Sequence, residues 1–266
     1  MMLLLDLGNS RLKWALAAQH PGPWLAQGAL GWDADLPAQL QLAWAQHPPV
    51  QAVVAASVVD AARESLVAAA VAGKFGAAPR WVRTPTSACG VRNAYGEPQR
   101  LGVDRFLAML AAHAAGYAPC VLAGAGTALT LDALTVDGQH LGGLIAPGVQ
   151  LMQRSLGVAT VHARTEQAGD IVDVARNTAD AVTSGCWHAA AALIERFVER
   201  MGPALGGAPT LVLGGGDAAR LQPLLRLPAH VMPDGVLHGL ARWAMANEMA
   251  APATGADGAD QRTGRP

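Results

Sequence analysis

Apolar residues follow two different spacings along this chain. The segment QAVVAASVV at residues 51–59 is a continuous run of small and β-branched residues, which is typical of a strand buried on both faces of a sheet. Other segments place apolar residues three and four positions apart, and this spacing predicts helices. They are residues 36–47, 60–75 and 103–117, with Asp60 placed to cap the second. Strands and helices in alternation predict an α/β fold.

The order of elements restarts near the middle of the chain. Residues 1–18 have the pattern of an apolar strand, a small-residue turn and a second strand, and residues 119–135 repeat that order. We therefore expect two duplicated α/β domains around a cleft, at residues 1–117 and 118–250. Residues 251–266 are polar, rich in glycine and alanine and without periodicity, which predicts a flexible tail.

The second half of the chain continues with further strands and helices. Its longest helix is expected after a capping residue, and a glycine run separates a strand from a helix closer to the C-terminus. The predicted segments are a strand, turn and helix at 138–156, a helix at 178–201 capped by Asn177 or Thr178, a strand, glycine turn and helix at 209–225, and a helix within 229–249.

Composition narrows the class of protein. Hydrophobic residues make up 52% of the chain and charged residues 15%, with a formal net charge of −1. These values exclude wholesale disorder and argue against nucleic acid as a partner, although a local basic patch is compatible with them. Residues 106–131 carry no Asp, Glu, Lys or Arg, but glycines and a proline divide them, which favours a buried helix and strand over a membrane span. Three scattered cysteines and an N-terminus without a basic leader predict a cytoplasmic protein with reduced thiols.

The turn after the first strand has the composition of a phosphate-binding segment. Gly8 lets main-chain N–H groups approach a polyanion, and Lys13 offers a positive charge to phosphate oxygens. Asp6, at the strand end, can hold Mg²⁺ through its water shell. An ordinary hairpin turn explains the same residues without a ligand.

Two more glycine turns follow apolar strands. One is Gly124-Ala125-Gly126-Thr127, which lacks the last glycine of the dinucleotide-binding fingerprint. The other is Gly214-Gly215-Gly216, which suits the flat face of a base or a nearby phosphate. Each alone is compatible with a plain turn, but three such turns after strands favour a nucleotide.

The segment RLGVDRF places an acidic residue next to a basic one at the start of a predicted helix. Asp104 can accept a hydroxyl proton, and Arg105 can bind a carboxylate or phosphate. The alternative for Asp104 is a helix-capping role. Tyr95 lies upstream in a loop, where it binds a ligand or covers the core.

In this order, the motifs resemble those of the type III pantothenate kinases. The resemblance runs from Leu3 to about Met249. Several short motifs in a fixed order are more specific than any one glycine turn. They are DLGNSRLK at 6–13, Tyr95, LGVDR at 101–105, AGTALTLD at 125–132, GGLIAPG at 142–148, NTADAVTSG at 177–185 and LVLGGGD at 211–217.

The resemblance implies two ribonuclease H-like domains of the acetate and sugar kinase/Hsp70/actin superfamily. It also implies ATP-dependent phosphorylation of pantothenate, the first step of coenzyme A synthesis, by a homodimer with Mg²⁺ bound to ATP. The implied ATP contacts are Asp6, Leu7, Gly8, Asn9, Ser10, Arg11, Leu12, Lys13, Thr127, Gly214, Gly215 and Gly216. The implied pantothenate contacts are Tyr95, Gly102, Val103, Asp104, Arg105 and Thr178, with Asp104 as the general base.

One position departs from the family pattern. Many members carry an aspartate two residues before the glycine of the GTA motif, where it helps to hold a monovalent cation (K⁺ or NH₄⁺). This chain has Gly124 there. We therefore expect a weakened cation site, unless backbone carbonyls or Asp132 compensate.

Two other classes of function are alternatives to a pantothenate kinase. A nicotinamide-dependent oxidoreductase is disfavoured by the incomplete fingerprint and by the lack of an acidic residue about 20 positions after Gly124. A nucleotide-binding regulatory protein without catalysis is the remaining alternative. The Asp104–Arg105 pair favours the enzyme, because a protein that only binds needs no base.

Overall fold

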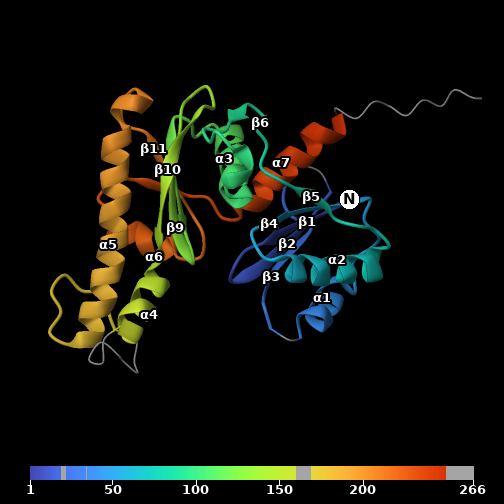
Figure 1. Cartoon of the computed structure of the whole chain (residues 1–266), viewed down its shortest axis with the longest axis horizontal. Coiled ribbons are helices and arrows are strands. Elements are labelled where there is room, and N and C mark those ends of the chain that lie inside the picture. The colour runs from blue at the N-terminus through green and yellow to red at the C-terminus, as the bar shows by residue number, and fades with distance from the viewer. Residues whose placement is uncertain (19–21, 34, 160–168, 250–266) are drawn as a thin grey trace, which may run out of the picture.

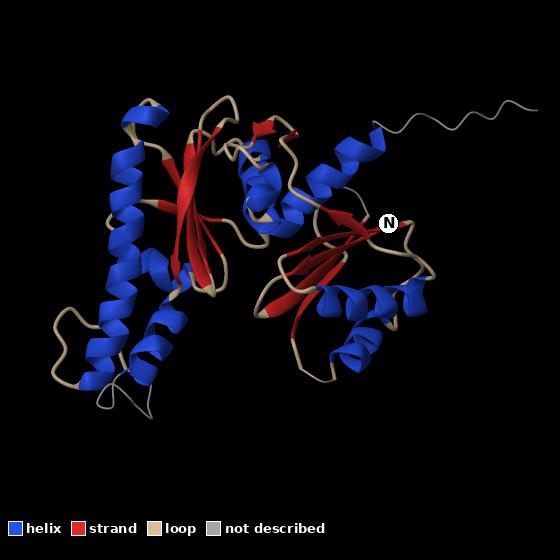
Figure 2. Cartoon of the chain, viewed as in Figure 1, coloured by secondary structure: helices blue, strands red, loops and turns tan. Residues whose placement is uncertain are grey.

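Two five-stranded sheets stand side by side, with a pair of helices between them (Figures 1 and 2). This computed structural model describes residues 1–18, 22–33, 35–159 and 169–249. The tail expected at 251–266 lies outside the described residues.

The first sheet has the strand order β3-β2-β1-β4-β5. β1 pairs antiparallel with β2 and parallel with β4, and the predicted hairpin at the N-terminus is confirmed. Helices α1 and α2 cover one face of this sheet, as Figure 1 shows. The elements are β1 (Met2–Leu7), β2 (Arg11–Ala17), β3 (Ala26–Gly31), α1 (Leu36–Trp44), β4 (Ala52–Ser57), α2 (Ala61–Phe75) and β5 (Arg80–Val82).

The second sheet repeats the first in order and direction, as β10-β9-β8-β11-β12. β8 pairs antiparallel with β9 and parallel with β11, as β1 pairs with β2 and β4. The duplicated α/β architecture is therefore confirmed. The elements are β8 (Cys120–Ala125), β9 (Ala128–Leu134), β10 (His140–Pro147), α4 (Val149–Ala159), α5 (Thr178–Met201), β11 (Thr210–Gly214), α6 (Ala218–Leu221) and β12 (Ala229–Val231).

Both predicted helix caps are present. Asp60 accepts a hydrogen bond from the N–H of Arg63 at the start of α2, and Asn177 accepts one from Asp180 at the start of α5. These contacts fix the first turn of each helix. Smaller elements join the main ones: β6 (Ser87–Ala88), β7 (Val91–Arg92) and the 3₁₀ turns Pro98–Arg100, Pro203–Leu205 and Gln222–Leu224.

Helices α3 (Val103–Ala114) and α7 (Gly235–Met249) fill the space between the sheets. They pack against each other, and α7, from the end of the chain, also lies on β1, β2 and β4 of the first sheet. One continuous core therefore contains Phe106 and Leu110 of α3 together with Leu240 of α7, and it takes in strand residues of both sheets. The division of the chain into domains at 117/118 stays a prediction.

The charge-free segment 106–131 forms the rest of α3, the buried strand β8 and the first residues of β9, so the expected helix and strand are present. Within the described part of the chain, no helix has both the length and the apolar character to cross a membrane.

Candidate active site

A cleft of about 500 Å³ lies where the two halves meet. Its walls come from the β1–β2 turn, the β8–β9 turn, the start of α3, the glycine turn after β11 and the start of α7. Four segments predicted separately from the sequence, at 6–13, 104–105, 124–127 and 214–216, therefore share one site.

The β1–β2 turn is closed by its own backbone. The N–H of Gly8 donates to the carbonyl of Arg11 at 3.1 Å, and the indole N–H of Trp32 donates to the carbonyl of Gly8 at 2.8 Å. Asp6, Gly8, Asn9, Ser10, Arg11 and Lys13 line the cleft. The side chains of Leu7 and Leu12 are fully buried in the core under α1 and α2, so these two residues can offer only backbone groups to a ligand.

The β8–β9 turn faces the first turn across the cleft. The hydroxyl oxygens of Ser10 and Thr127 are 2.6 Å apart and share a hydrogen bond, so the two turns touch through side chains. Each hydroxyl can donate and accept, which suits both to phosphate oxygens. This contact between Ser10 and Thr127 is consistent with both residues binding the same ligand.

Backbone packs directly on backbone behind the β8–β9 turn. Gly215 has φ +89°, and a Cβ at this position would lie 2.1 Å from the carbonyl oxygen of Ala125. The N–H of Asp217 donates to the same carbonyl at 3.1 Å. Only glycine fits at 215, so this glycine turn packs more closely against the backbone of Ala125 than a turn with a side chain there could.

Asp104 stands in the first turn of α3 and points into the cleft. One of its carboxylate oxygens accepts the N–H of Arg105 at 2.8 Å. Gly102 makes room for this carboxylate, because a Cβ at 102 would lie 2.6 Å from the Asp104 Oδ1 atom. Burial raises the pKa of Asp104 above its usual range, although the Arg105 N–H and charge oppose the rise. A carboxylate with a raised pKa is a stronger base.

Arg105 is buried and already has a carboxylate partner. Its Nε and Nη2 atoms donate to the two oxygens of Asp132 at 2.9 and 2.6 Å, and Nη1 donates to the Tyr95 hydroxyl at 3.3 Å. Burial disfavours the charged guanidinium, but the bonds to Asp132 outweigh this and raise the pKa of Arg105. His140 Nε2 also bonds Asp132, at 2.9 Å. Neither contact was predicted from the sequence: Asp132 as the partner of Arg105, or His140 as a further partner of Asp132.

Carboxylates gather around Lys13. Burial and the nearby charge of Asp104 raise the pKa of Asp6 to about 7, although Lys13 opposes the rise. The ammonium of Lys13 lies 3.3 Å from Asp234, which precedes α7. Asp234 was not predicted as a site residue, and its signal was only an acidic residue before a predicted helix.

Other residues were missed or lie elsewhere. Gln150 and Arg154 of α4 line the cleft. Val103 is buried in the core, and Thr178 is exposed at the start of α5; neither lines the cleft within this chain. Gly124 does line the cleft, and a Cβ there would meet the Thr130 hydroxyl at 2.6 Å.

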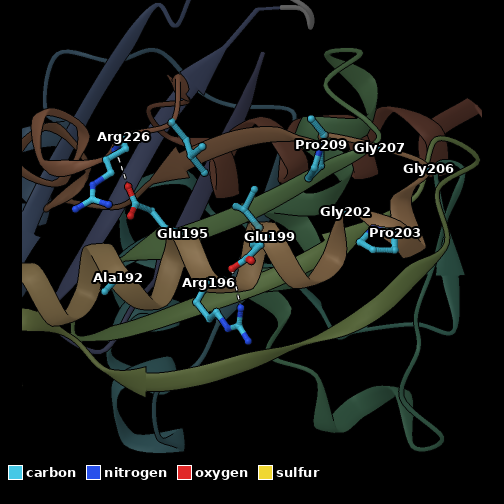
Figure 3. A pocket seen from close by; sticks show the side chains of 13 residues that line it. Ala192, Glu195, Arg196, Glu199, Gly202, Pro203, Gly206, Gly207, Pro209 and Arg226 are labelled. Carbon is cyan, nitrogen blue, oxygen red and sulfur yellow. Dashed lines mark hydrogen bonds and ion pairs between the residues drawn. The ribbon is translucent and has the colours of Figure 1, made fainter.

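A wider hollow of about 880 Å³ opens at the end of α5, shown in Figure 3. Both of its carboxylates are engaged: Glu195 accepts the backbone N–H of Arg226 at 2.6 Å, and Glu199 accepts from Arg196 at 2.7 Å. It shares no residue with the cleft. The convergent polar groups and raised carboxylate pKa values are in the cleft, so we take the cleft as the functional site.

Two sheets of the same strand order around a cleft with three glycine turns define the acetate and sugar kinase/Hsp70/actin fold class. A solved Sinorhizobium meliloti protein, named as a 2-dehydro-3-deoxygalactonokinase, has a TM-score of 0.59 at 15% identity and covers 96% of this chain and 98% of its own. A Campylobacter jejuni protein assigned to the Baf family of transcriptional activators has a TM-score of 0.60 at 20% identity, with coverage of 93% and 99%.

Sequence comparison identifies the family within this class. Residues 2–200 match the type III pantothenate kinase family. The type III pantothenate kinase of Aromatoleum aromaticum is 41% identical, with 91% of this chain and 96% of the relative covered. That of Xanthomonas oryzae pv. oryzae is 43% identical, with 91% and 97% covered. The chain belongs to the type III pantothenate kinase family.

Proposed function

We propose that this chain transfers the γ-phosphoryl group of ATP to the terminal hydroxyl of pantothenate, the first step of coenzyme A synthesis. Family membership supports the reaction. The observation that carries the assignment is geometric: the half-buried carboxylate of Asp104 shares one cleft with Lys13 and with two turns suited to phosphate. Family membership does not favour the alternative of a nucleotide-binding protein without catalysis.

The residues of the cleft suit ATP bound across both turns. Main-chain N–H groups near Gly8 and Gly126, the hydroxyls of Ser10 and Thr127, and the charge of Lys13 supply donors for phosphate oxygens. The backbone of Gly214–Gly216 leaves space for the nucleoside. The catalytic effect of such a site comes mostly from positioning and charge stabilisation.

Asp6 suits a Mg²⁺ ion carried by ATP. Its carboxylate lines the cleft beside Lys13 and carries a raised pKa, which a divalent cation would lower again. Among the described residues, no three His, Cys, Asp or Glu side chains meet as a metal-binding group. The ion would therefore take most ligands from phosphate and water, and when bound it would neutralise charge on the β- and γ-phosphates.

The proton and phosphoryl transfers follow from these positions. Asp104 accepts the proton of the pantothenate hydroxyl as that oxygen bonds to the γ-phosphorus. The bond from the γ-phosphorus to the bridging oxygen of ATP breaks, and ADP leaves with that oxygen. Arg105, beside Asp104, offers its remaining N–H groups to the carboxylate of pantothenate.

We further propose a homodimer, in which the partner supplies Thr178. Strand β10 lies at the edge of its sheet, and its Leu141, Leu144 and Ile145 side chains are exposed, the last to 64%. Exposed apolar residues on an edge strand favour burial against a second copy. Thr178 does not line the cleft of its own chain, and a partner docked on β10 could bring its own Thr178 there. Sedimentation of the purified protein tests the dimer.

The monovalent cation and cellular location complete the proposal. Asp132 is already engaged by Arg105 and His140, which makes it a poor substitute for the family aspartate missing at Gly124. We therefore propose that any K⁺ or NH₄⁺ binds weakly. The cytoplasm, where ATP is available, is the proposed site of action.

A coupled assay of ADP release, with and without pantothenate, tests the reaction. The variant Asp104→Asn preserves shape and removes the base, so turnover should fall about 10²–10⁴-fold while ATP binding persists. Calorimetric titration with ATP serves as the folding and binding control. Turnover within threefold of the parent would return Asp104 to a purely structural role in the first turn of α3.

A further inference from the structure

A closed ring of four buried or half-buried side chains lies behind Arg105. Arg105 donates to both oxygens of Asp132, and His140 Nε2 bonds Asp132 Oδ1 at 2.9 Å. The ring of His140 stacks on that of Tyr95, with centroids 6.1 Å apart and planes 15° from parallel. The Tyr95 hydroxyl accepts from Arg105 Nη1, which closes the ring of contacts.

The tautomer of His140 follows from its surroundings. The backbone N–H of Ala94 points at His140 Nδ1, 3.4 Å away, so Nδ1 must accept and carries no proton. The ring proton is then on Nε2 and is donated to Asp132. His140 thus joins the loop before Tyr95 to the carboxylate that holds Arg105.

The contacts with Asp132 and Tyr95 use only part of the Arg105 guanidinium. A guanidinium carries five N–H donors, and three of them are used by Asp132 and Tyr95. The two that remain belong to Nη1 and Nη2. Arg105 and Asp132 line the cleft, whereas His140 does not and is only 1% exposed.

The neighbouring strand leaves room for this arrangement. Gly143 of β10 is the direct partner of Asp132 of β9. A Cβ at 143 would lie 1.8 Å from the Leu131 carbonyl oxygen, and also 2.7 Å from Asp132 Oδ1 and 2.9 Å from Arg105 Nη2. This gives a physical reason for glycine in the GGLIAPG segment.

We propose that Asp132 and His140 are positioning residues for the acceptor, which fix Arg105 and Tyr95 so that the Nη1 and Nη2 donors meet the carboxylate of pantothenate. The inference rests on the proposed function for its substrate. Among the residues that the structure describes, no hydrogen bond or ion pair joins the turns proposed to bind ATP to this ring. Disturbing the ring should therefore affect the acceptor and spare ATP.

Three variants and a control test this. Asp132→Asn keeps the shape and removes the charge, and we expect the KM for pantothenate to rise at least about tenfold while the KM for ATP changes less than about twofold. His140→Gln retains a donor near the Nε2 position, and His140→Asn retains only an acceptor near Nδ1. We expect the smaller rise in pantothenate KM for Gln.

The control is Asp137→Asn, in the same hairpin. It breaks an exposed ion pair with Arg92 at 2.9 Å, so both KM values should stay unchanged. A fall in thermal stability of Asp132→Asn with both KM values unchanged would reduce the ring to a structural role and overturn the proposal. An equal rise in both KM values would also overturn it.

Nitrogen-15 NMR of the histidine rings separates this proposal from the reaction itself. We expect a neutral His140 with its proton on Nε2, and a shifted signal in Asp132→Asn. A proton on Nδ1 would overturn the inference even if the enzyme phosphorylates pantothenate. If the parent shows the expected tautomer but no pantothenate-dependent ADP release and no calorimetric binding of pantothenate, the proposed function fails, and the acceptor role of the ring fails with it.

Discussion

The two turns that face each other across the cleft are closed by similar backbone hydrogen bonds but differ in charge. In β1–β2, Asp6 pairs across the strands with Lys13. In β8–β9, Gly124 pairs with Thr130 at the corresponding place. Both turns close in the same way, with the N–H of Gly8 or Gly126 donating to a carbonyl two or three residues later at 3.1 Å.

The difference indicates that the two duplicated hairpins have different roles in the cleft. The first turn places the titratable side chains of Asp6 and Lys13 at the cleft, while the second offers neutral groups and closely packed backbone. Gly148 shows this packing: a Cβ there would lie 1.9 Å from the carbonyl oxygen of Gly126. The first turn has more space, since a Cβ at Gly8 would be 3.3 Å from its nearest neighbour, the Arg11 carbonyl.

The largest effect is expected from removing the charge of the first turn. Lys13→Met should lower kcat/KM at least about 100-fold, because one lost donor to a developing charge costs about that much. Thr130→Val, at the corresponding place in the second hairpin, should cost less than about tenfold. Steady-state kinetics of both variants decides, and equal losses would mean that the two hairpins share the electrostatic role.

Next in size is the effect of pH on stability through Asp6. Its pKa of about 7 in the folded chain exceeds the ordinary 3.8, so the folded chain binds the extra proton between about pH 4 and 7. Stability therefore falls as the pH rises through this window. Asp6→Asn removes the ionisation, and at pH 8 it should be more stable than the parent, by at most about 4 kcal/mol.

Denaturant unfolding at several pH values, in metal-free buffer, measures this difference. It should shrink steadily toward pH 4. Lys13→Met should move the upper end of the window to higher pH, because Lys13 lowers the pKa of Asp6. A difference between Asp6→Asn and the parent that stays constant from pH 4 to 8 would contradict the assignment.

The close packing of the second turn should show in stability. Gly148→Ala forces a methyl group against the Gly126 carbonyl and should cost about 1–3 kcal/mol of unfolding free energy. Gly8→Ala, with its nearest neighbour at 3.3 Å, is the matched control and should cost less. Thermal unfolding compares the two, and the reverse order would show that the first turn is the more crowded one.

The smallest effect concerns the cation. We expect the parent to respond weakly to KCl, and Gly124→Asp to be activated at lower KCl, because a carboxylate returns to the family position. The Thr130 hydroxyl, 2.6 Å from the new Cβ, must rotate away. Turnover at 0 to about 200 mM KCl, with a bulky cation holding ionic strength, measures this. Steep saturation of the parent by low-millimolar K⁺ would show that Gly124 has not weakened the site.

Local sequence patterns predicted much of the fold, but they could not predict contacts between segments far apart in the sequence. The two hairpins, α3 and the caps at Asp60 and Asn177 follow from spacing and capping chemistry. Strand β3 was missed because its AQGALG segment is short and rich in small residues; its Gly28 instead makes room for the ring of Trp14, 2.7 Å from a Cβ placed there. Strand β12 was missed because it is only three residues long and lies within the segment 229–249, which was predicted to contain a helix.

The site shows the same limit. Asp104, Lys13 and the glycine turns were found because their motifs are contiguous. The partners of Arg105 and Lys13 were not, because Asp132 and Asp234 come from segments 27 and 221 positions away. A carboxylate in an otherwise apolar strand, as at Asp132, was the available signal for a buried ion pair.

The position of α7 sets the order in which the chain can fold during synthesis. Sheets usually complete their cores as the ribosome delivers their segments, N-terminal part first. Here Leu4 and Val54 of the first sheet share their core with Leu237 and Leu240 of the final helix. Helix α3 covers part of this face of the first sheet, and the rest stays uncovered until residues 235–249 have been synthesised. A chain stopped before residue 235 leaves apolar surface exposed in the half that is otherwise finished.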